Sequence, residues 1–280
     1  MMVFVKLFKS INIYITHIYL MVIYMFLKTL LKYLIISLVQ GFTEPLPISS
    51  SAHMIIISNL LDIKTNDLTL EIFLNFASML AIFIFVFTKR MNLKSTIKNP
   101  ILLIKIIIAS IPTVICGLLF KAKIEEFSIN FIFIGVTLLI TCLMLLLSYR
   151  LYNKTKENNV SNNNALKLGF GQTLALLPGI SRMGSVLTTG IFCRIKIRTI
   201  LDFSFLMYLV VSLGSFILSI PDLLTISINL LPIYIISFIT TFIFTYFSIK
   251  WFYNIIHKKT LLIFSIYTFI LGIILIIIGQ

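Results

Sequence analysis

Two short polar stretches interrupt an otherwise apolar chain, and both contain side chains suited to binding phosphate. The first reads GFTEPLPISSSAH over residues 41–53 and contains Glu44, three consecutive serines and His53. Its two prolines should break the backbone, so that a new helix can begin near Ser49. Serine hydroxyls and free N–H groups in the first turn of such a helix bind anions. A nearby carboxylate and imidazole can move a proton or activate a nucleophile.

The second stretch reads LPGISRMGS over residues 177–185 and places one arginine among small and apolar neighbours. A Pro–Gly turn comes directly before Ile180, Ser181 and Arg182. The guanidinium group of arginine is planar and permanently charged, and its paired donors match phosphate oxygens. An arginine in this position can also snorkel toward the surface. If Arg182 is buried instead, it needs an anion, and either Glu44 or a diphosphate can supply one.

These polar groups are costly at membrane depth, and the composition predicts that they lie there. The chain has 280 residues, of which 59% are hydrophobic and 11% charged, and its mean hydropathy is +1.09. Soluble domains carry about 25% charged residues. The net charge of +14 falls in short clusters between apolar runs, which is typical of cytoplasmic loops and not of nucleic-acid binding. The three cysteines lie in or beside apolar segments without paired spacing, which predicts neither a disulfide nor a zinc site.

Six apolar runs approach or exceed the roughly 20 residues that a helix needs to cross a bilayer. They are residues 69–88, 101–120, 128–149, 202–220, 229–250 and 260–279. When the runs are threaded alternately, the four main basic clusters fall on one side, which is predicted to be cytoplasmic. The chain is therefore predicted to be an all-α polytopic membrane protein. Three interpretations of the apolar residues 1–24 stay open. The segment is a signal peptide without a cleavage site, an extra hydrophobic arm, or sequence upstream of a true start at Met25.

Two further segments cannot span the membrane under this threading and must enter and return on the same side. Residues 31–61 are predicted to enter from the outer face, and residues 168–193 from the cytoplasm. Both contain proline and serine where a helix would have to break. Such irregular backbone is tolerated at membrane depth only where protein or a water-filled cavity surrounds it.

The two halves of the chain also match each other at a nearly constant offset. Gly41 corresponds to Gly171, and Pro47 corresponds to Pro178. Each repeat then contains one re-entrant hairpin and three spanning helices, and an odd number of spans inverts the second copy. Inverted repeats place their functional site near the midplane, between the broken segments. The predicted single membrane domain consists of repeat 1 (25–149), a cytoplasmic Asn-rich linker (150–164) and repeat 2 (165–280).

Several of these residues also have simpler structural interpretations. Ser49 can cap a helix while the next two serines satisfy backbone groups. Glu71 and Asp202 lie at the start of spanning runs, at equivalent positions of the two halves. Acids there are more often partners of the helix dipole than catalysts. Asn75 is interpreted as a polar contact between helices.

The first stretch, read from Gln40, resembles the E-G-x-T-E-x-x-P-x-S-S-x-G-H motif of the bacterial undecaprenyl-diphosphate phosphatase (bacitracin-resistance) family. The second resembles the P-G-x-S-R-S-G motif of the same family, and the resemblance covers residues 25–280. It implies an enzyme of the bacterial inner membrane with two re-entrant hairpins in an inverted repeat. The implied reaction converts undecaprenyl diphosphate to undecaprenyl phosphate and phosphate, which recycles the lipid carrier for peptidoglycan and other cell-wall synthesis.

The resemblance also implies roles for individual residues. Arg182 would neutralise phosphate charge, Ser50 or a water would be the nucleophile, and Glu44 and His53 would handle protons. A divalent cation, Mg²⁺ or Ca²⁺, is an expected cofactor with Glu44 as its ligand, and a homodimer is left open. The implied catalytic residues are Glu44, Ser50, His53 and Arg182, and the implied phosphate-binding residues are Gln40, Ser49, Ser51 and Ser181.

The chain departs from the family pattern at four positions in or near the motifs. Gln40 stands where the motif has a glutamate, and Ala52 replaces a glycine. Met183 and Val186 replace small or hydroxylated residues. An amide can bind phosphate but cannot take up a proton or neutralise a metal, so Gln40→Glu is predicted to raise turnover. Two other functions stay open: a flippase for polyprenyl phosphates, since inverted repeats also build carriers, and a homologue that binds the lipid without turnover.

Overall fold

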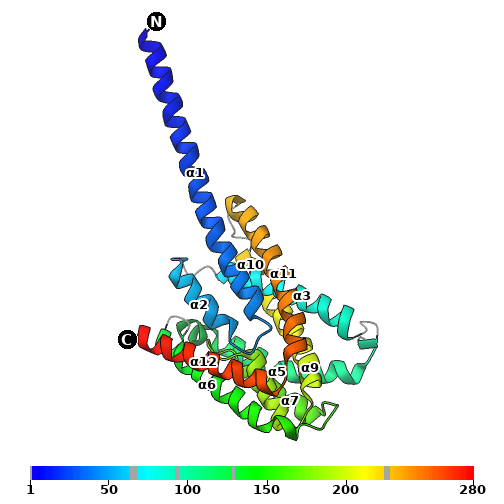
Figure 1. Cartoon of the computed structure of the whole chain (residues 1–280). Helices are drawn as coiled ribbons and strands as arrows, with labels where there is room; N and C mark the ends of the chain where they lie inside the picture. Colours follow the sequence, from blue (N-terminus) through cyan, green and yellow to red (C-terminus); the bar gives the residue numbers. More distant parts are fainter. Residues whose placement is uncertain (1, 64–67, 92–94, 97, 128–129, 224–227) are drawn as a thin grey trace.

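The computed structural model describes residues 2–63, 68–91, 95–96, 98–127, 130–223 and 228–280, and these residues are almost entirely helical (Figure 1). The first helix extends well beyond the bundle formed by the others (Figure 1). The long helices are α1 (Met2–Thr43), α3 (Leu68–Phe85), α5 (Pro100–Phe127), α6 (Phe131–Leu151), α9 (Ile197–Leu218), α11 (Leu231–Ile255) and α12 (Lys258–Ile278). The shorter ones are α2 (Ser50–Leu60), η1 (Val86–Arg90), η2 (Tyr152–Lys154), α7 (Asn162–Leu174), α8 (Arg182–Phe192), α10 (Ile220–Leu223) and η3 (Ile228–Leu230).

The predicted class is confirmed, because the described residues contain seven helices that are long and apolar enough to cross a membrane. Residues 121–127, which separate the second and third predicted runs, form the last turns of α5, since neither glycine nor proline occurs among them. Residues 128 and 129, where the third run was expected to begin, lie outside the described part of the chain. The six predicted runs correspond to Leu70–Arg90, Pro100–Phe120, Phe131–Lys154, Ile197–Leu218, Ile228–Ile255 and Lys258–Ile278.

The seventh candidate span, Thr16–Thr43, joins part of the N-terminal stretch to the first limb of the predicted hairpin. α1 is one continuous helix of 42 residues because neither glycine nor proline occurs in it before Gly41. Its residues 16–28 are all exposed, whereas buried positions begin at Tyr33 and contact α11. Met25 is therefore not a helix boundary, although packing against the bundle begins shortly after it.

The two predicted hairpins are pairs of helices that meet at a broken turn. In the first pair, α1 ends at Thr43 and α2 begins at Ser50, with both prolines of the motif between them. In the second pair, α7 has 13 residues and α8 has 11. At about 1.5 Å per residue, neither α7 nor α8 can cross the roughly 30 Å of a bilayer core. Re-entrant insertion and the inverted repeat stay predictions that agree with these lengths.

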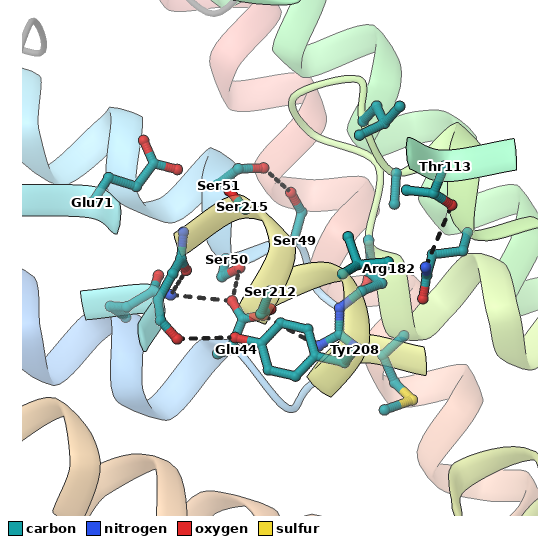
Figure 2. A pocket seen from close by; sticks show the side chains of 18 of the residues that line it. Glu44, Ser49, Ser50, Ser51, Glu71, Thr113, Arg182, Tyr208, Ser212 and Ser215 are labelled. Atoms are coloured by element: carbon teal, nitrogen blue, oxygen red, sulfur yellow. Dashed lines mark hydrogen bonds and ion pairs between the residues drawn. The ribbon is translucent and has the colours of Figure 1, made fainter. Parts of the chain in front are cut away.

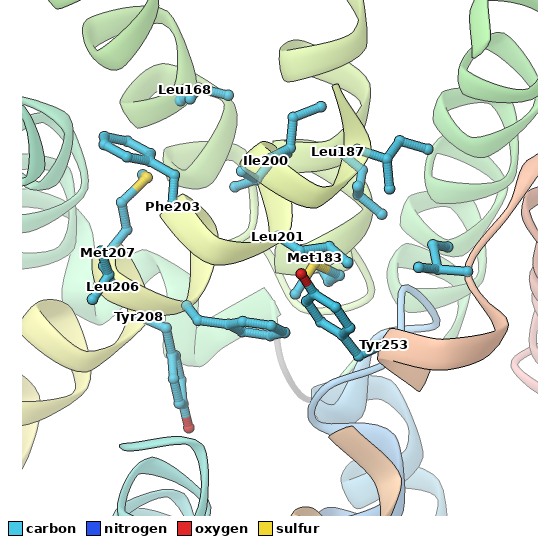
Figure 3. Packing of buried hydrophobic residues seen from close by; sticks show 14 of the residues in the cluster. Leu168, Met183, Leu187, Ile200, Leu201, Phe203, Leu206, Met207, Tyr208 and Tyr253 are labelled. Carbon is cyan, nitrogen blue, oxygen red and sulfur yellow. The ribbon is translucent and has the colours of Figure 1, made fainter. Parts of the chain in front are cut away.

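The second hairpin is embedded in the largest apolar core of the molecule (Figure 3). Met183 and Leu187 of α8 are fully buried and pack with Leu201 and Phe203 of α9. Met183 directly follows Arg182, so this packing also fixes the first turn of α8. The core thus holds Arg182 in place even though the guanidinium group itself is polar.

Close approach of two glycines joins α6 to α12. A Cβ atom on Gly135 would lie 2.7 Å from the carbonyl oxygen of Gly272, which is far closer than van der Waals contact. Small residues at such crossings are typical of membrane helices, whose association depends on tight packing. Nearby, Ser265 Oγ donates to the carbonyl of Cys142 at 3.0 Å, which adds a polar contact between the same helices.

Gly135→Ala should therefore destabilise the protein in detergent by about 1–3 kcal/mol, because the added methyl group forces α6 and α12 apart. Gly214→Ala in α9 is the matched control, since a Cβ at that position meets no heavy atom within 4 Å. Thermal unfolding of both variants measures the difference. Equal unfolding temperatures would contradict the close approach of the two helices.

Candidate active site

A cavity of about 230 Å³ lies where the two hairpins meet, and α3, α5 and α9 complete its walls (Figure 2). One part of the wall is polar and includes Glu44, Ser50 and Arg182. The cavity therefore suits a ligand with one charged end and one apolar end. The apolar part of the wall includes Ile72 and Phe76 of α3 and Val211 and Phe216 of α9.

The turn between α1 and α2 presents its serines through an unusual backbone conformation. Ser49 has φ 67° and ψ 92°, and a residue other than glycine rarely adopts positive φ. Its Oγ accepts a hydrogen bond from the Ala52 N–H at 3.3 Å and caps α2, which confirms the simpler interpretation of this serine. Because Ser49 caps the helix, the Ser50 hydroxyl is free to contact the cavity.

Glu44 is the centre of the polar wall and receives three hydrogen bonds (Figure 2). Ser50 Oγ donates to Oε2 at 2.5 Å, and Gln40 Nε2 donates to the same oxygen at 3.1 Å. Arg182 Nη2 donates to Oε1 at 3.2 Å. The Glu44 side chain is only 8% exposed, so the arginine is the counter-ion that a buried carboxylate needs. The structure thus brings Gln40, Glu44, Ser50 and Arg182 together.

Arg182 keeps one donor available for a second anion. Ser181 caps α8 by accepting a hydrogen bond from the Gly184 N–H at 3.1 Å, which places Arg182 in the first turn. The guanidinium carbon lies 3.9 Å from the ring centroid of Tyr208, a favourable cation–π distance. Nη1 is buried and has no hydrogen-bond partner among the described residues. The side chain is 16% exposed and does not snorkel, so its geometry favours binding of an anion at Nη1.

Two threonines of α6 hold the turn of the second hairpin. Thr137 Oγ1 donates to the carbonyl of Pro178 at 2.5 Å, and Thr141 Oγ1 donates to the carbonyl of Gly179 at 3.0 Å. Gly179 has φ 94°, which favours glycine, and a Cβ there would overlap Thr137. The turn that precedes Arg182 is therefore anchored to a helix outside the hairpin.

Two further serine contacts join the hairpins to each other. Ser51 Oγ accepts a hydrogen bond from the Gly179 N–H at 3.4 Å and lies 3.1 Å from Ser49 Oγ. Ser181 Oγ lies 3.5 Å from the carbonyl of Leu46. All three predicted phosphate-binding serines line the cavity, but each already has a structural contact.

His53 is not among the described residues that line the cavity. Its Nδ1 lies 2.7 Å from the Ser49 carbonyl oxygen, which can only accept, so Nδ1 carries the hydrogen. Its Nε2 lies 2.6 Å from the hydroxyl of Tyr267 in α12, and the two rings stack with centroids 5.7 Å apart. Proton transfer by His53 stays a prediction. The contact that the structure shows is between the ring and the Ser49 carbonyl, and it stabilises the strained backbone of Ser49.

Variants of His53 separate these two roles. Asparagine can place an N–H near the position of Nδ1, so His53→Asn should keep activity within about tenfold, the effect of one weakened hydrogen bond. His53→Ala should lose more, because the Ser49 carbonyl then keeps only the long bond from the backbone N–H of residue 53, at 3.4 Å. Phosphate release across a range of pH measures both. An equally deep loss with asparagine, together with a missing limb of the pH–rate profile, would instead support proton transfer.

The environment of Gln40 changes what its replacement should do. Gln40 Nε2 donates to Glu44 Oε2 and also to Asn75 Oδ1, the latter at 2.7 Å. A carboxylate at position 40 would face these two acceptors without a donor and would repel Glu44. We therefore expect Gln40→Glu to lower turnover at micromolar Mg²⁺ and to raise it above that of the unmodified protein at saturating Mg²⁺. Turnover measured over a Mg²⁺ titration tests this, and a curve parallel to that of the unmodified protein would contradict it.

The two acids at equivalent positions of the halves have different surroundings. Glu71 of α3 lines the cavity and is labelled in Figure 2 at a distance from the Glu44 cluster. Asp202 instead pairs with Arg90 at 3.2 Å and accepts a hydrogen bond from the Tyr253 hydroxyl at 3.3 Å. It lies in the second turn of α9, which begins earlier than predicted, at Ile197. Asp202 is therefore the anion of a structural ion pair.

Sequence reasoning missed five polar residues of the cavity wall, which are Thr113, Gln172, Tyr208, Ser212 and Ser215. Tyr208 lies under the Arg182 guanidinium, and Gln172 of the second hairpin contacts Thr113 of α5. Nothing in the local sequence shows which way each of these side chains faces. Asn75, interpreted as a contact between helices, indeed contacts Gln40 of α1 and also lines the cavity.

The chain is similar to known proteins over most of its length. The family model described as "Bacitracin resistance protein BacA" matches residues 33–274, which include both hairpins. Undecaprenyl-diphosphatase 2 of Bacillus thuringiensis (strain Al Hakam) is 37% identical over 266 residues, covering 89% of this chain and 97% of the relative. Undecaprenyl-diphosphatase of Oceanobacillus iheyensis is 37% identical over 269 residues, covering 89% and 96%. The chain therefore belongs to the bacitracin resistance protein BacA family.

Proposed function

We propose that the chain is an undecaprenyl-diphosphate phosphatase of the bacterial plasma membrane, which releases the terminal phosphate and recycles the lipid carrier for cell-wall synthesis. The observation that carries this proposal is the buried, unpartnered Nη1 of Arg182 in a cavity shared with Ser50 and Glu44. A phosphate oxygen is the acceptor that such a donor needs. The names of the relatives support undecaprenyl diphosphate as the substrate.

The two-sided cavity supports a lipid diphosphate in particular. The diphosphate would bind between Arg182 and the first turn of α2, where the helix dipole and free N–H groups favour negative charge. The first units of the prenyl chain would lie along the apolar wall that includes Phe76 and Phe216. A free inorganic diphosphate would leave this wall exposed to water, so the cavity favours the lipid.

The contact between Ser50 and Glu44 supports either of two chemical routes. Ser50 Oγ donates its hydrogen to Glu44, so the carboxylate is placed to accept the proton if Ser50 attacks phosphorus. If a water attacks instead, the same hydroxyl would hold a phosphate oxygen. In both routes Arg182 would stabilise the charge that builds on the transferred phosphoryl group, which is the main contribution a protein makes to phosphoryl transfer.

A divalent cation that enters with the substrate is part of the proposal. The described residues contain no cluster of three or more His, Cys, Asp or Glu side chains that could hold a metal. Mg²⁺, however, commonly binds to one or two carboxylates together with substrate phosphates. Glu44 lines the cavity and would be its protein ligand. The ion would neutralise part of the diphosphate charge.

Phosphate release from undecaprenyl diphosphate by the purified protein in detergent tests the function. We expect release with Mg²⁺ present, loss with a chelator, and recovery when Mg²⁺ is restored. Absence of release under every metal condition would overturn the proposal. Liposomes in which the protein moves undecaprenyl phosphate across the bilayer without hydrolysis would favour a flippase, and binding without either event would favour a homologue that lacks turnover.

A homodimer would form from two chains of 32.0 kDa. The arrangement described above places both halves of the site within one chain. We propose that a single chain suffices for catalysis. Light scattering of the active detergent-solubilised protein, with the detergent contribution subtracted, tests this, and activity confined to the dimer fraction would contradict it.

A further inference from the structure

Gln172 of α7 is a buried polar residue of the cavity wall that the proposed chemistry does not yet use. It is 2% exposed and lines the cavity together with Arg182 and Ser181. Its Oε1 is buried and has no hydrogen-bond partner among the described residues. A buried amide oxygen without a partner is costly, so a residue that keeps one next to a ligand cavity indicates that the ligand supplies the missing hydrogen.

Neighbouring hydroxyl groups fix which end of the amide is unpaired. Gln172 Nε2 lies 3.4 Å from Thr113 Oγ1. Thr173 donates its own hydrogen to the carbonyl of Gly169 at 2.9 Å. Thr113 therefore has two acceptors for its single hydrogen, the Thr173 oxygen at 3.3 Å and the Gly169 carbonyl at 3.5 Å. With its hydrogen directed to either of these, the Thr113 oxygen accepts from Gln172 Nε2, as in the structure, and Oε1 is left unpaired.

The cavity wall thus contains two unpaired buried atoms of opposite kind. Arg182 Nη1 is a donor, and Gln172 Oε1 is an acceptor. An ionised phosphate oxygen pairs with the donor but cannot pair with the acceptor, because it carries no hydrogen. The group that fits Gln172 next to a bound diphosphate is an O–H, and in a hydrolase this O–H belongs to water.

Resting on the proposed function, we propose that Gln172 is a catalytic residue that orients the water which attacks phosphorus. Oε1 accepts one hydrogen of the water and so directs a lone pair of its oxygen toward the phosphoryl group. Gln172 accepts a hydrogen bond only and takes up no proton. The role holds in both routes, since a phosphorylated Ser50 also has to be cleaved by water.

The atoms balance in the direct route. The water oxygen forms a bond to the terminal phosphorus, and the bond from that phosphorus to the bridging oxygen breaks. The electron pair of the broken bond stays on the lipid monophosphate. Both hydrogens of the water leave on the released phosphate as dihydrogen phosphate, which loses one to solvent at neutral pH.

The position of this wall agrees with the role. Thr113, which holds the Gln172 amide, lies on the other side of Arg182 from Ser50 in Figure 2. A phosphoryl group bound by Arg182 can therefore have Ser50 on one side and the water on the other. Phosphoryl transfer requires the attacking and leaving oxygens to lie roughly in line, so a water on the wall opposite Ser50 suits the cleavage of a phosphorylated Ser50.

Gln172→Met removes the amide and keeps the length of the side chain. With undecaprenyl diphosphate as substrate, we expect kcat to fall by about 100-fold, as for loss of one positioned catalytic group, with KM within twofold of the unmodified protein. Leu174→Met is the matched control, since Leu174 lies on the same helix, is exposed and does not line the cavity. It should leave both constants unchanged.

Competition between water and methanol as attacking groups gives a second measurement, the ratio of methyl phosphate to phosphate. This ratio should stay constant if Gln172 has only a structural role. The unmodified protein should favour water, whereas Gln172→Met should form several-fold more methyl phosphate per phosphate released. An unchanged kcat, an unchanged product ratio, or a rise in KM alone would overturn the proposal. A variant that loses activity only by unfolding would show the unmodified product ratio in its residual turnover. The failure of the proposed function is a separate result, because it appears as absence of phosphate release by the unmodified protein.

Discussion

Arg182→Ala should abolish phosphate release, with a loss of roughly 10³-fold or more, which is the effect of removing an arginine that neutralises a transferring phosphoryl group. The expectation depends on two contacts of the guanidinium, the bond from Nη2 to Glu44 and the unpartnered Nη1. Phosphate release at saturating substrate measures the loss. The turnover of Arg182→Lys should lie between that of the unmodified protein and that of Arg182→Ala. Lysine keeps the positive charge but loses the planar guanidinium group and its flat contact with Tyr208.

The ion pair with Glu44 makes a control necessary. Removing one partner of a buried pair leaves an uncompensated charge and can prevent the protein from accumulating. The double variant Arg182→Met/Glu44→Gln removes both charges and should restore accumulation while phosphate release stays absent. Appreciable phosphate release by a well-folded Arg182→Ala protein would show that the arginine serves packing and not the substrate.

Ser50→Ala should lower kcat by about 10²- to 10⁴-fold, the range for a positioned group that takes part in bond making or proton transfer. Its hydroxyl lies 2.5 Å from Glu44 and belongs to the first residue of α2. Stability should change little, because Ser49 and not Ser50 caps the helix. Turnover and thermal unfolding, measured on the same preparation, test both statements.

Ser51→Ala is the matched control for Ser50→Ala. Ser51 is its direct neighbour, and its hydroxyl contacts Ser49 and the backbone of Gly179, with no hydrogen bond to Glu44 among the described residues. We expect its loss of activity to be at least tenfold smaller than that of Ser50→Ala, since it removes a contact worth about 1 kcal/mol. Equal losses for the two serines would indicate that Ser50 acts only through the shape of the turn.

Much of the fold could be predicted because membrane burial requires long apolar runs. The six predicted runs all became helices, and the break at Pro45 and Pro47 fell where the prolines remove backbone donors. The pairing of Arg182 with Glu44 was one of two alternatives that follow from the cost of a buried charge. The helical structure of residues 121–127 was not predicted, since charged residues lower hydropathy without ending a helix.

Residue type and spacing alone could not give the direction in which single side chains face. His53 follows Ser50 by three residues in the same motif, yet its ring turns to Tyr267 in α12. Gln172 and Tyr208 lie in helices whose rotation is set by packing against neighbours distant in sequence. Their roles depend on tertiary contacts, and only the assembled cavity makes those contacts visible.

The bond between Glu44 and Arg182 joins residues 138 positions apart in the chain. During synthesis, the first hairpin is therefore complete long before its arginine partner has left the ribosome. A growing chain cannot bind the diphosphate headgroup with both halves of the site until α8 has been inserted. The complete site therefore exists only in a chain that extends through α8.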